Sequence, residues 1–212
     1  PAINYHKRFP GADQAMTDTR EVQPAFTKAG WDFMKGAIKN PDRYFSGEQW
    51  VLGEQVSSKI DRAKLIEQLQ QKYNSDYITE WRAFLRAGSV QRYANIADAS
   101  KKLSLQTGPQ SPLLALIWLV SQNTAVDGKD VADVFQPAQA VVPSTSTDRY
   151  IAPPNQNYMN ALLGLQTSLE QIVGQPAPNE AVASQILGNA STAKLAARQL
   201  AQTFRLDPEG HV

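Results

Sequence analysis

The chain contains few residues whose types and spacing could support catalysis or metal binding. Its two histidines, His6 and His211, have no second potential ligand at helical spacing. Asp127, Asp130 and Asp133 lie three residues apart and could present carboxylates to a hard cation from one helix face. The simpler interpretation, which we prefer, is that Asp127 or Asp130 caps a helix and favours its N-terminal dipole. The sequence therefore predicts no catalytic, cofactor-binding or metal-binding residue.

The motifs of the common enzyme classes are missing from the sequence. There is no cysteine, no phosphate-binding Gly-rich loop, no Gly-x-Ser-x-Gly elbow and no His-Glu-x-x-His helix. The serine–lysine neighbours at 58–59 and 100–101 would point about 100° apart on a helix, and no third group accompanies them. A hydrolase would require the fold to gather distant charged groups such as Glu48, Asp76 and Arg82. We therefore predict that the chain is not an enzyme.

Aromatic residues recur on one side of a long predicted helix. Tyr73, Tyr77, Trp81 and Phe84 follow steps of three or four residues, as do Ile66 and Leu69 before them. Such a row could stack on a carbohydrate or a nucleobase. Core packing is the preferred interpretation, with the polar ends of Tyr and Trp bonded to partners.

The overall composition is that of a folded domain. The chain has 212 residues, of which 42% are hydrophobic and 19% charged, and its formal net charge is +1. Because the basic residues are scattered, nucleic acid is not an expected partner. The longest apolar stretch, 112–120, is about half the roughly 20 residues needed to span a bilayer. Since the chain has no initial Met and stops directly after an apparent helix, we expect an excised segment whose membrane anchor lies outside it.

The elements that must position these residues are helices. Apolar spacing, start signals and breakers predict helices at 25–38, 58–85, 93–103, 111–124, about 130–135, 158–173, 180–187 and 192–204. Asn74-Ser75 is a candidate break in the long helix, and Gly88 is expected to end it with a left-handed cap. Ser111 is expected to cap the helix at 111–124 through its side chain, with Pro112 at the first helical position. That helix is apolar all round, which predicts burial on every side.

The fold class is accordingly all-α, an irregular multi-helix bundle with a buried central helix, arranged as one unit or as two helical subdomains. We expect a helical domain over 1–140 with an irregular lead-in, an exposed loop over 141–157, a helical subdomain over 158–205 and the start of a truncated following domain over 206–212.

Four segments, taken in order, resemble the C-terminal periplasmic region of the IcmF/TssM family of type VI secretion systems. They are 26–34, 47–53, 73–85 and 111–114. The residues that match the family pattern, all interpreted as structural, are Thr27, Gly30, Trp31, Trp50, Leu52, Gly53, Tyr77, Trp81, Phe84, Leu85, Ser111, Pro112 and Leu113.

The resemblance implies a non-catalytic periplasmic scaffold segment of an inner-membrane protein that does not itself cross the membrane. The parent would join the inner-membrane base, including a TssL-like protein and further copies of itself, to a TssJ-like outer-membrane lipoprotein. In the family a β-rich domain that follows the helical region supplies much of the lipoprotein contact, so binding is expected through that domain. An alternative is a peptidoglycan-binding module that uses exposed Tyr, Trp and Gln side chains.

Overall fold

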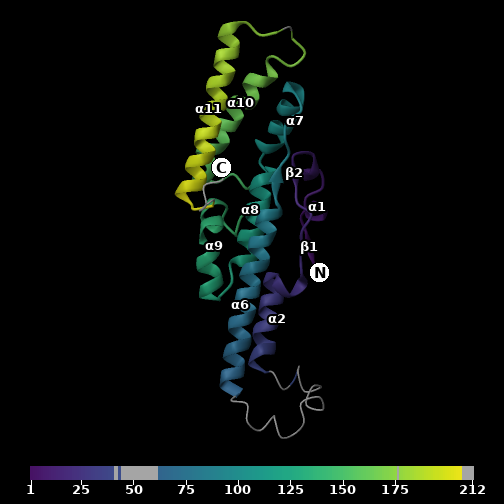
Figure 1. Ribbon diagram of the computed structural model, residues 1–212, viewed down its shortest axis with the longest axis vertical. Coiled ribbons are helices and arrows are strands. Elements are labelled where there is room, and N and C mark those ends of the chain that lie inside the picture. Colours follow the sequence, from purple (N-terminus) through teal and green to yellow (C-terminus); the bar gives the residue numbers. More distant parts are fainter. Residues whose placement is uncertain (41–42, 44–61, 176, 207–212) are drawn as a thin grey trace.

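A computed structural model describes residues 1–40, 43, 62–175 and 177–206, and this part of the chain is predominantly helical (Figure 1). The all-α fold class is confirmed. The α-helices are α1 (Tyr5–Arg8), α2 (Lys28–Lys39), α6 (Arg62–Ala87), α7 (Ile96–Gln106), α8 (Pro112–Thr124), α9 (Lys129–Val141), α10 (Gln156–Glu170) and α11 (Glu180–Thr203). Figure 1 shows an elongated arrangement, with α2 and α6 toward one end and α7, α10 and α11 toward the other.

The core is built around α8, which α2, α6, α7 and α9 contact. Leu114, Leu119 and Val120 are almost fully buried, and so is most of the remaining surface of this helix. The predicted aromatic face of α6 is also confirmed, because Tyr77, Trp81 and Phe84 have no exposed surface. The all-round apolar sequence of α8 and the one-sided apolar row of α6 thus produce a buried helix and a covering helix.

The 26-residue helix α6 is continuous, contrary to the candidate break at Asn74-Ser75. The side-chain amide of Gln70 donates to Asn74 Oδ1 at 2.7 Å, one helical turn away, so Asn74 bonds within the helix instead of ending it. The predicted left-handed cap at Gly88 is wrong, because only Gly11 and Gly174 among the described glycines have positive φ. A Cβ at Gly88 would instead collide with the side chain of Leu116. Gly88 therefore serves the close approach of α6 to α8.

The two helices predicted at 180–187 and 192–204 form a single helix, α11. Asn179 caps its start by accepting from Val182 N at 3.0 Å. Ser191 and Thr192 lie where the break was expected, and their hydroxyls donate to the carbonyl oxygens of Leu187 and Gly188 one turn earlier. Because these polar side chains find partners within the helix and α10 packs alongside, the helix continues.

The N-terminal lead-in takes part in two short antiparallel pairs, and the second of them ties it to the bundle. Strand β1 (Ile3–Asn4) pairs with β3 (Glu21–Val22), and β2 (Met16–Thr17) pairs with β4 (Ser89–Val90), which follows α6. Short 3₁₀ helices η1 (Ala12–Gln14), η2 (Pro24–Phe26) and η4 (Pro153–Asn155) complete the described elements. Tyr5 is fully buried and donates to Pro112 O at 2.7 Å, so the lead-in reaches the start of α8.

The sequence suggested that the segment 141–157 is an exposed loop, but part of this segment is buried. Val142, Tyr150 and Asn155 are buried in it, and the side-chain amide of Asn155 donates to Val141 O and Tyr150 O. These bonds fold the segment back on itself and satisfy its buried carbonyl groups. The main hydrophobic core contains residues from both sides of the segment, including Tyr158 and Met159. The division of the chain into domains stays a prediction, and the expected following domain at 206–212 lies outside the described residues except for Leu206.

Candidate functional site

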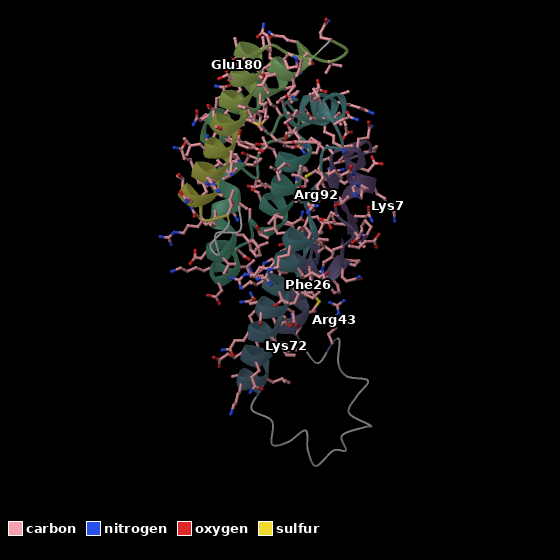
Figure 2. The ribbon with its side chains drawn as sticks, turned by 45° about the horizontal axis from the view of Figure 1, so that its top comes forward. Lys7, Phe26, Arg43, Lys72, Arg92 and Glu180 are labelled. Carbon is pink, nitrogen blue, oxygen red and sulfur yellow. The ribbon has the colours of Figure 1, made fainter. Side chains whose placement is uncertain are left out.

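Several of the described family-pattern residues lie where the start of α2 contacts α6. Trp81 Nε1 donates to Phe26 O at 2.8 Å, and the hydroxyl of Tyr73 donates to Ala25 O. Phe26, labelled in Figure 2, stacks on Tyr73 with ring centroids 5.9 Å apart. The short helix η2 does not continue, so its last carbonyl groups lack backbone N–H donors, and aromatic side chains of α6 donate to them instead. The polar ends of the aromatic row therefore serve the fold.

Thr27 and Gly30 determine how α2 begins. Thr27 Oγ1 accepts from Gly30 N at 3.0 Å and donates to Pro24 O at 2.9 Å, which makes Thr27 the N-cap. Gly30 has no room for a side chain, because a Cβ there would collide with Pro24 O and lie 2.6 Å from Ala25 O. The Thr-x-x-Gly spacing thus folds η2 tightly against the first turn of α2.

Trp31 connects α2 to the turn before α9. Its Nε1 donates to Asp127 Oδ1 at 2.8 Å, and Lys35 forms an ion pair with the same carboxylate. The hydrogen bond from Lys35, and then that from Trp31, lowers the pKa of Asp127 below its ordinary value. A Cβ at Gly128 would collide with the Trp31 ring. Asp127 therefore does not cap α9, whose N-cap is Gly128, and only Asp130 lies in the first turn of that helix.

Asn123 joins three helices and was not singled out by the sequence. Its Oδ1 accepts from Lys28 N at 3.1 Å, its Nδ2 donates to Leu119 O at 2.9 Å, and its carbonyl oxygen accepts from the Tyr77 hydroxyl at 2.6 Å. Burial raises the pKa of Tyr77, so this hydroxyl stays a donor. No local motif marks Asn123, because its partners are 46 and 95 residues away.

The start of α8 departs from the predicted capping. Ser111 makes no side-chain cap, and its Oγ donates to Gln106 Oε1 at 3.2 Å. The same Gln106 oxygen accepts from Leu113 N at 3.1 Å. The preceding helix therefore supplies the cap, and Gln106 is a second residue that sequence reasoning missed. Pro112 occupies the first helical position, as predicted.

Asp18 is a buried carboxylate in the lead-in. Its Oδ1 accepts from Arg20 N at 2.9 Å, and its own N–H donates to His6 Nε2 at 3.2 Å. Within the described ranges, Asp18 Oδ2 and His6 Nδ1 are buried atoms without a hydrogen-bond partner. Burial raises the pKa of Asp18 above its ordinary value.

The remaining candidates are not brought together in the described part of the chain. Asp76 forms an ion pair with Lys72 on α6, and Ser100 is buried whereas Lys101 is exposed. Glu48, the pair at 58–59 and the family-pattern residues Trp50, Leu52 and Gly53 lie outside the described residues. Across the parts that the structure describes, no three His, Cys, Asp or Glu side chains form a group that could hold a metal ion, and no helix is long and apolar enough to span a membrane.

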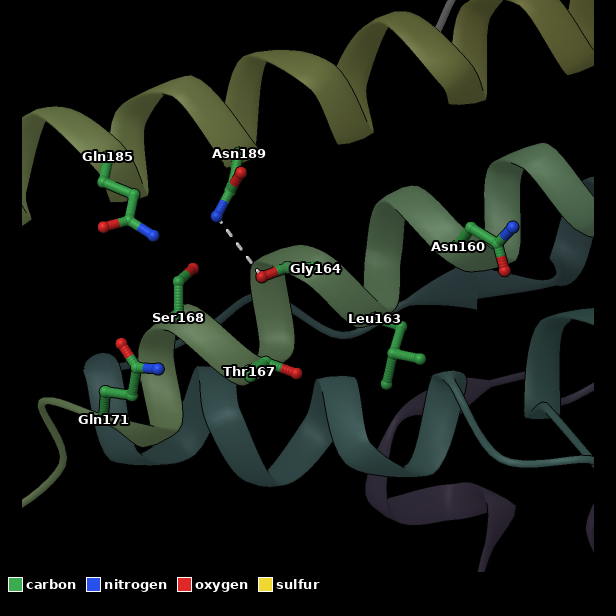
Figure 3. Close-up of a pocket in the computed structure, with 8 residues that line it drawn as sticks. All are labelled: Asn160, Leu163, Gly164, Thr167, Ser168, Gln171, Gln185 and Asn189. Atoms are coloured by element: carbon green, nitrogen blue, oxygen red, sulfur yellow. Dashed lines mark hydrogen bonds between the residues drawn. The ribbon is translucent and has the colours of Figure 1, made fainter.

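Two shallow clefts adjoin one another on the surface formed by α7, α10 and α11. The first has a volume of about 380 Å³ and lies over α10 and α11, with Gly164, Thr167 and Gln171 on one helix and Gln185 and Asn189 on the other (Figure 3). The second, of about 430 Å³, extends from α10 to the turn after α7 and the segment before η4. Asn160 and the half-exposed Leu163 line both clefts, which together we call the α10 trough.

The described geometry is that of a helical domain in which aromatic side chains of α6 hold the start of α2, and the comparisons agree with the family resemblance. A family model described as "IcmF-related: Intracellular multiplication and human macrophage-killing" matches residues 1–125, and the chain belongs to this family. The match covers the lead-in and the elements from α2 to α8.

A relative gives a more particular likeness. The chain is 31% identical over 83 residues to the "Type VI secretion system component TssM1" of Pseudomonas aeruginosa. The alignment covers 39% of this chain and 8% of the relative, so the chain spans less than a tenth of that protein. No solved structure matches.

Proposed function

We propose that the chain is a non-catalytic, periplasmic scaffold segment of a type VI secretion membrane complex. Membership of the IcmF-related family and the likeness to TssM1 support this proposal. The observation that carries it is the use of the family-pattern side chains: Trp31, Tyr77 and Trp81 donate their hydrogen bonds to groups of the chain itself. Because these side chains bond to the chain itself, their role is to stabilise the fold.

The shape suits a spacer. At 1.5 Å per residue the 26-residue helix α6 is about 39 Å long, and α2, α8 and α9 all contact it. A braced helix resists bending and can hold a distance between binding partners. In the proposal these partners are an inner-membrane base with a TssL-like protein, further copies of the parent, and a TssJ-like outer-membrane lipoprotein bound through a following β-rich domain.

Co-purification with the lipoprotein from the same source tests the partner assignment. The chain by itself and a version extended into the parent sequence beyond Val212 are each expressed with the lipoprotein. Binding by the longer version alone is expected. If neither version binds, or if deletion of this segment from the parent leaves assembly and secretion intact, the scaffold proposal fails.

Cysteine labelling tests the compartment, because the chain has no cysteine. Ser184→Cys places a thiol on the exposed face of α11, and Ser121→Cys places one in the fully buried part of α8. In a parent protein otherwise free of cysteine, a membrane-impermeant maleimide applied after outer-membrane permeabilisation should label position 184 and leave position 121 unlabelled until denaturation. Labelling at 184 that requires lysis of the inner membrane would contradict a periplasmic location.

The cell-wall alternative gains no support from the described tryptophan residues. Trp31, Trp81 and Trp118 are buried and cannot stack on a sugar. A sacculus pull-down separates the two functions, because a scaffold should remain in the supernatant and a peptidoglycan-binding module should sediment.

A further inference from the structure

The α10 trough is lined mainly by uncharged polar side chains. The side chains of Thr167, Gln171 and Gln185 line the first cleft and make no hydrogen bond with the described part of the chain. An amide side chain offers donors and an acceptor, and a hydroxyl offers both. The trough thus presents unpaired groups that match the alternating N–H and C=O groups of a polypeptide backbone.

Arg149 gives the second cleft a positive charge. This residue is exposed and has no ion pair or hydrogen bond among the described residues. Of the described residues that line the two clefts, none is Asp or Glu, so the guanidinium group has no carboxylate inside the trough. An arginine fork binds a carboxylate in a planar, two-bond geometry. The charge therefore favours an occupant that brings its own acidic group.

Gly164 lies in the middle of the trough, and because it has no side chain, α10 does not project into the trough at this position. A Cβ there would meet nothing within 4 Å, so no neighbour in the fold requires the glycine. A glycine inside a helix is unfavourable by comparison with Ala, and here it exposes the helix backbone, whose Gly164 carbonyl accepts from Asn189 Nδ2 at 3.4 Å (Figure 3). The missing side chain permits another chain to approach closely.

We propose that the α10 trough binds an extended polypeptide segment of a partner subunit, with an Asp or Glu side chain of that segment at Arg149. Asn160 and Gln171 are about 16 Å apart along α10, which about five residues of extended chain would cover. Ile151 and Leu163 provide apolar contacts in the second cleft for side chains of the segment. The described lining has no aromatic side chain, so a stacked sugar or base fits it less well. This inference does not depend on the scaffold proposal, and either can fail without the other.

Oriented peptide libraries test the proposal directly. One library contains eight-residue peptides, acetylated and amidated at the ends, with Asp or Glu fixed at the fourth position and uncharged residues elsewhere. The matched library has Asn or Gln at that position. The immobilised chain should retain the acidic library about fivefold more strongly, as expected for an exposed ion pair. Arg149→Gln should make the two libraries equal. Equal retention by the unaltered chain, or no retention of either library, would overturn the proposal.

Glycine substitutions locate the binding. Gly164→Leu adds a side chain inside the trough at a position where its Cβ meets nothing, and it should lower retention of both libraries at least about tenfold. Gly36→Leu is the matched control, since Gly36 in α2 also has nothing within 4 Å of a Cβ and lies outside the trough. Neither variant should lower the thermal midpoint. Retention that Gly164→Leu leaves unchanged would place the binding elsewhere and contradict the proposal. The proposal would also be contradicted if the chain sedimented with peptidoglycan sacculi and Gly164→Leu abolished this sedimentation, because the trough would then bind cell wall.

Discussion

Trp31 and Asp127 are 96 residues apart in the chain, and their side chains are joined by a 2.8 Å hydrogen bond from the indole to the carboxylate. The bond connects the first turn of α2 to the turn that leads into α9. Asp127 lies two residues beyond the part of the chain that matches the family model. Lys35 binds the same carboxylate from the next turn of α2. This pair therefore links the family-matched helices to the C-terminal half of the bundle.

The indole N–H of Trp31 should report the ionisation of Asp127. The pKa of Asp127 is lowered in the folded protein, so its contribution to stability is present above the ordinary carboxyl pKa and is lost as the pH falls through the lowered value. In an NMR titration the Trp31 indole resonance should move with an apparent pKa below 3.8. The Trp81 indole is the control, because it donates to a backbone carbonyl that does not titrate. A Trp31 midpoint at or above 3.8 would contradict the assignment.

Gly30→Ala should reduce the free energy of unfolding by about 1–3 kcal/mol, because the added Cβ collides with backbone carbonyl groups of η2 that cannot rotate away. Gly36→Ala in the same helix meets nothing and should raise it by up to about 1 kcal/mol through helix propensity. Urea denaturation followed by circular dichroism measures both. Similar effects of the two substitutions would show that the close approach at Gly30 is unimportant.

Tyr77→Phe should lower the free energy of unfolding by about 1–3 kcal/mol. The ring stays in place, but the buried carbonyl of Asn123 loses its donor. Tyr93→Phe is the matched control, since Tyr93 is half exposed and has no hydrogen bond to the described residues, and it should change stability by less than about 0.5 kcal/mol. Chemical denaturation of both variants provides the measurement. Equal effects would mean that water replaces the Tyr77 hydroxyl.

Asp18→Asn should increase stability at pH 7. Burial raises the pKa of Asp18, so the contribution of this carboxyl group to stability is fully present below its ordinary pKa and is lost as the pH rises through the raised value. The asparagine keeps an acceptor for Arg20 N without a buried charge. Thermal midpoints of the two proteins should therefore differ at pH 7 and converge near pH 3. A variant that is less stable at pH 7 would indicate that attraction to His6 and Arg20 outweighs burial.

The sequence by itself determined the elements that depend on local periodicity. The apolar row of α6 and the charge-free stretch of α8 predict their helices and burial correctly, because a helix places every third or fourth side chain on one face. The position of Pro112 follows equally from a local rule, whereas the helix predicted from residue 25 begins at Lys28 behind the Thr27 cap. The four family motifs were sufficient to identify the IcmF-related family.

The tertiary structure decided where long-range partners meet. Gln106 rather than Ser111 caps α8, Gly88 serves a close contact instead of a left-handed turn, and Asn123 joins three helices. Likewise, α11 continues through a polar stretch because α10 packs beside it, and the α10 trough combines residues up to 82 positions apart, from Thr107 to Asn189. Local spacing cannot reveal such pairs, because the free energy of each contact depends on which distant groups the completed fold places within hydrogen-bonding or packing distance.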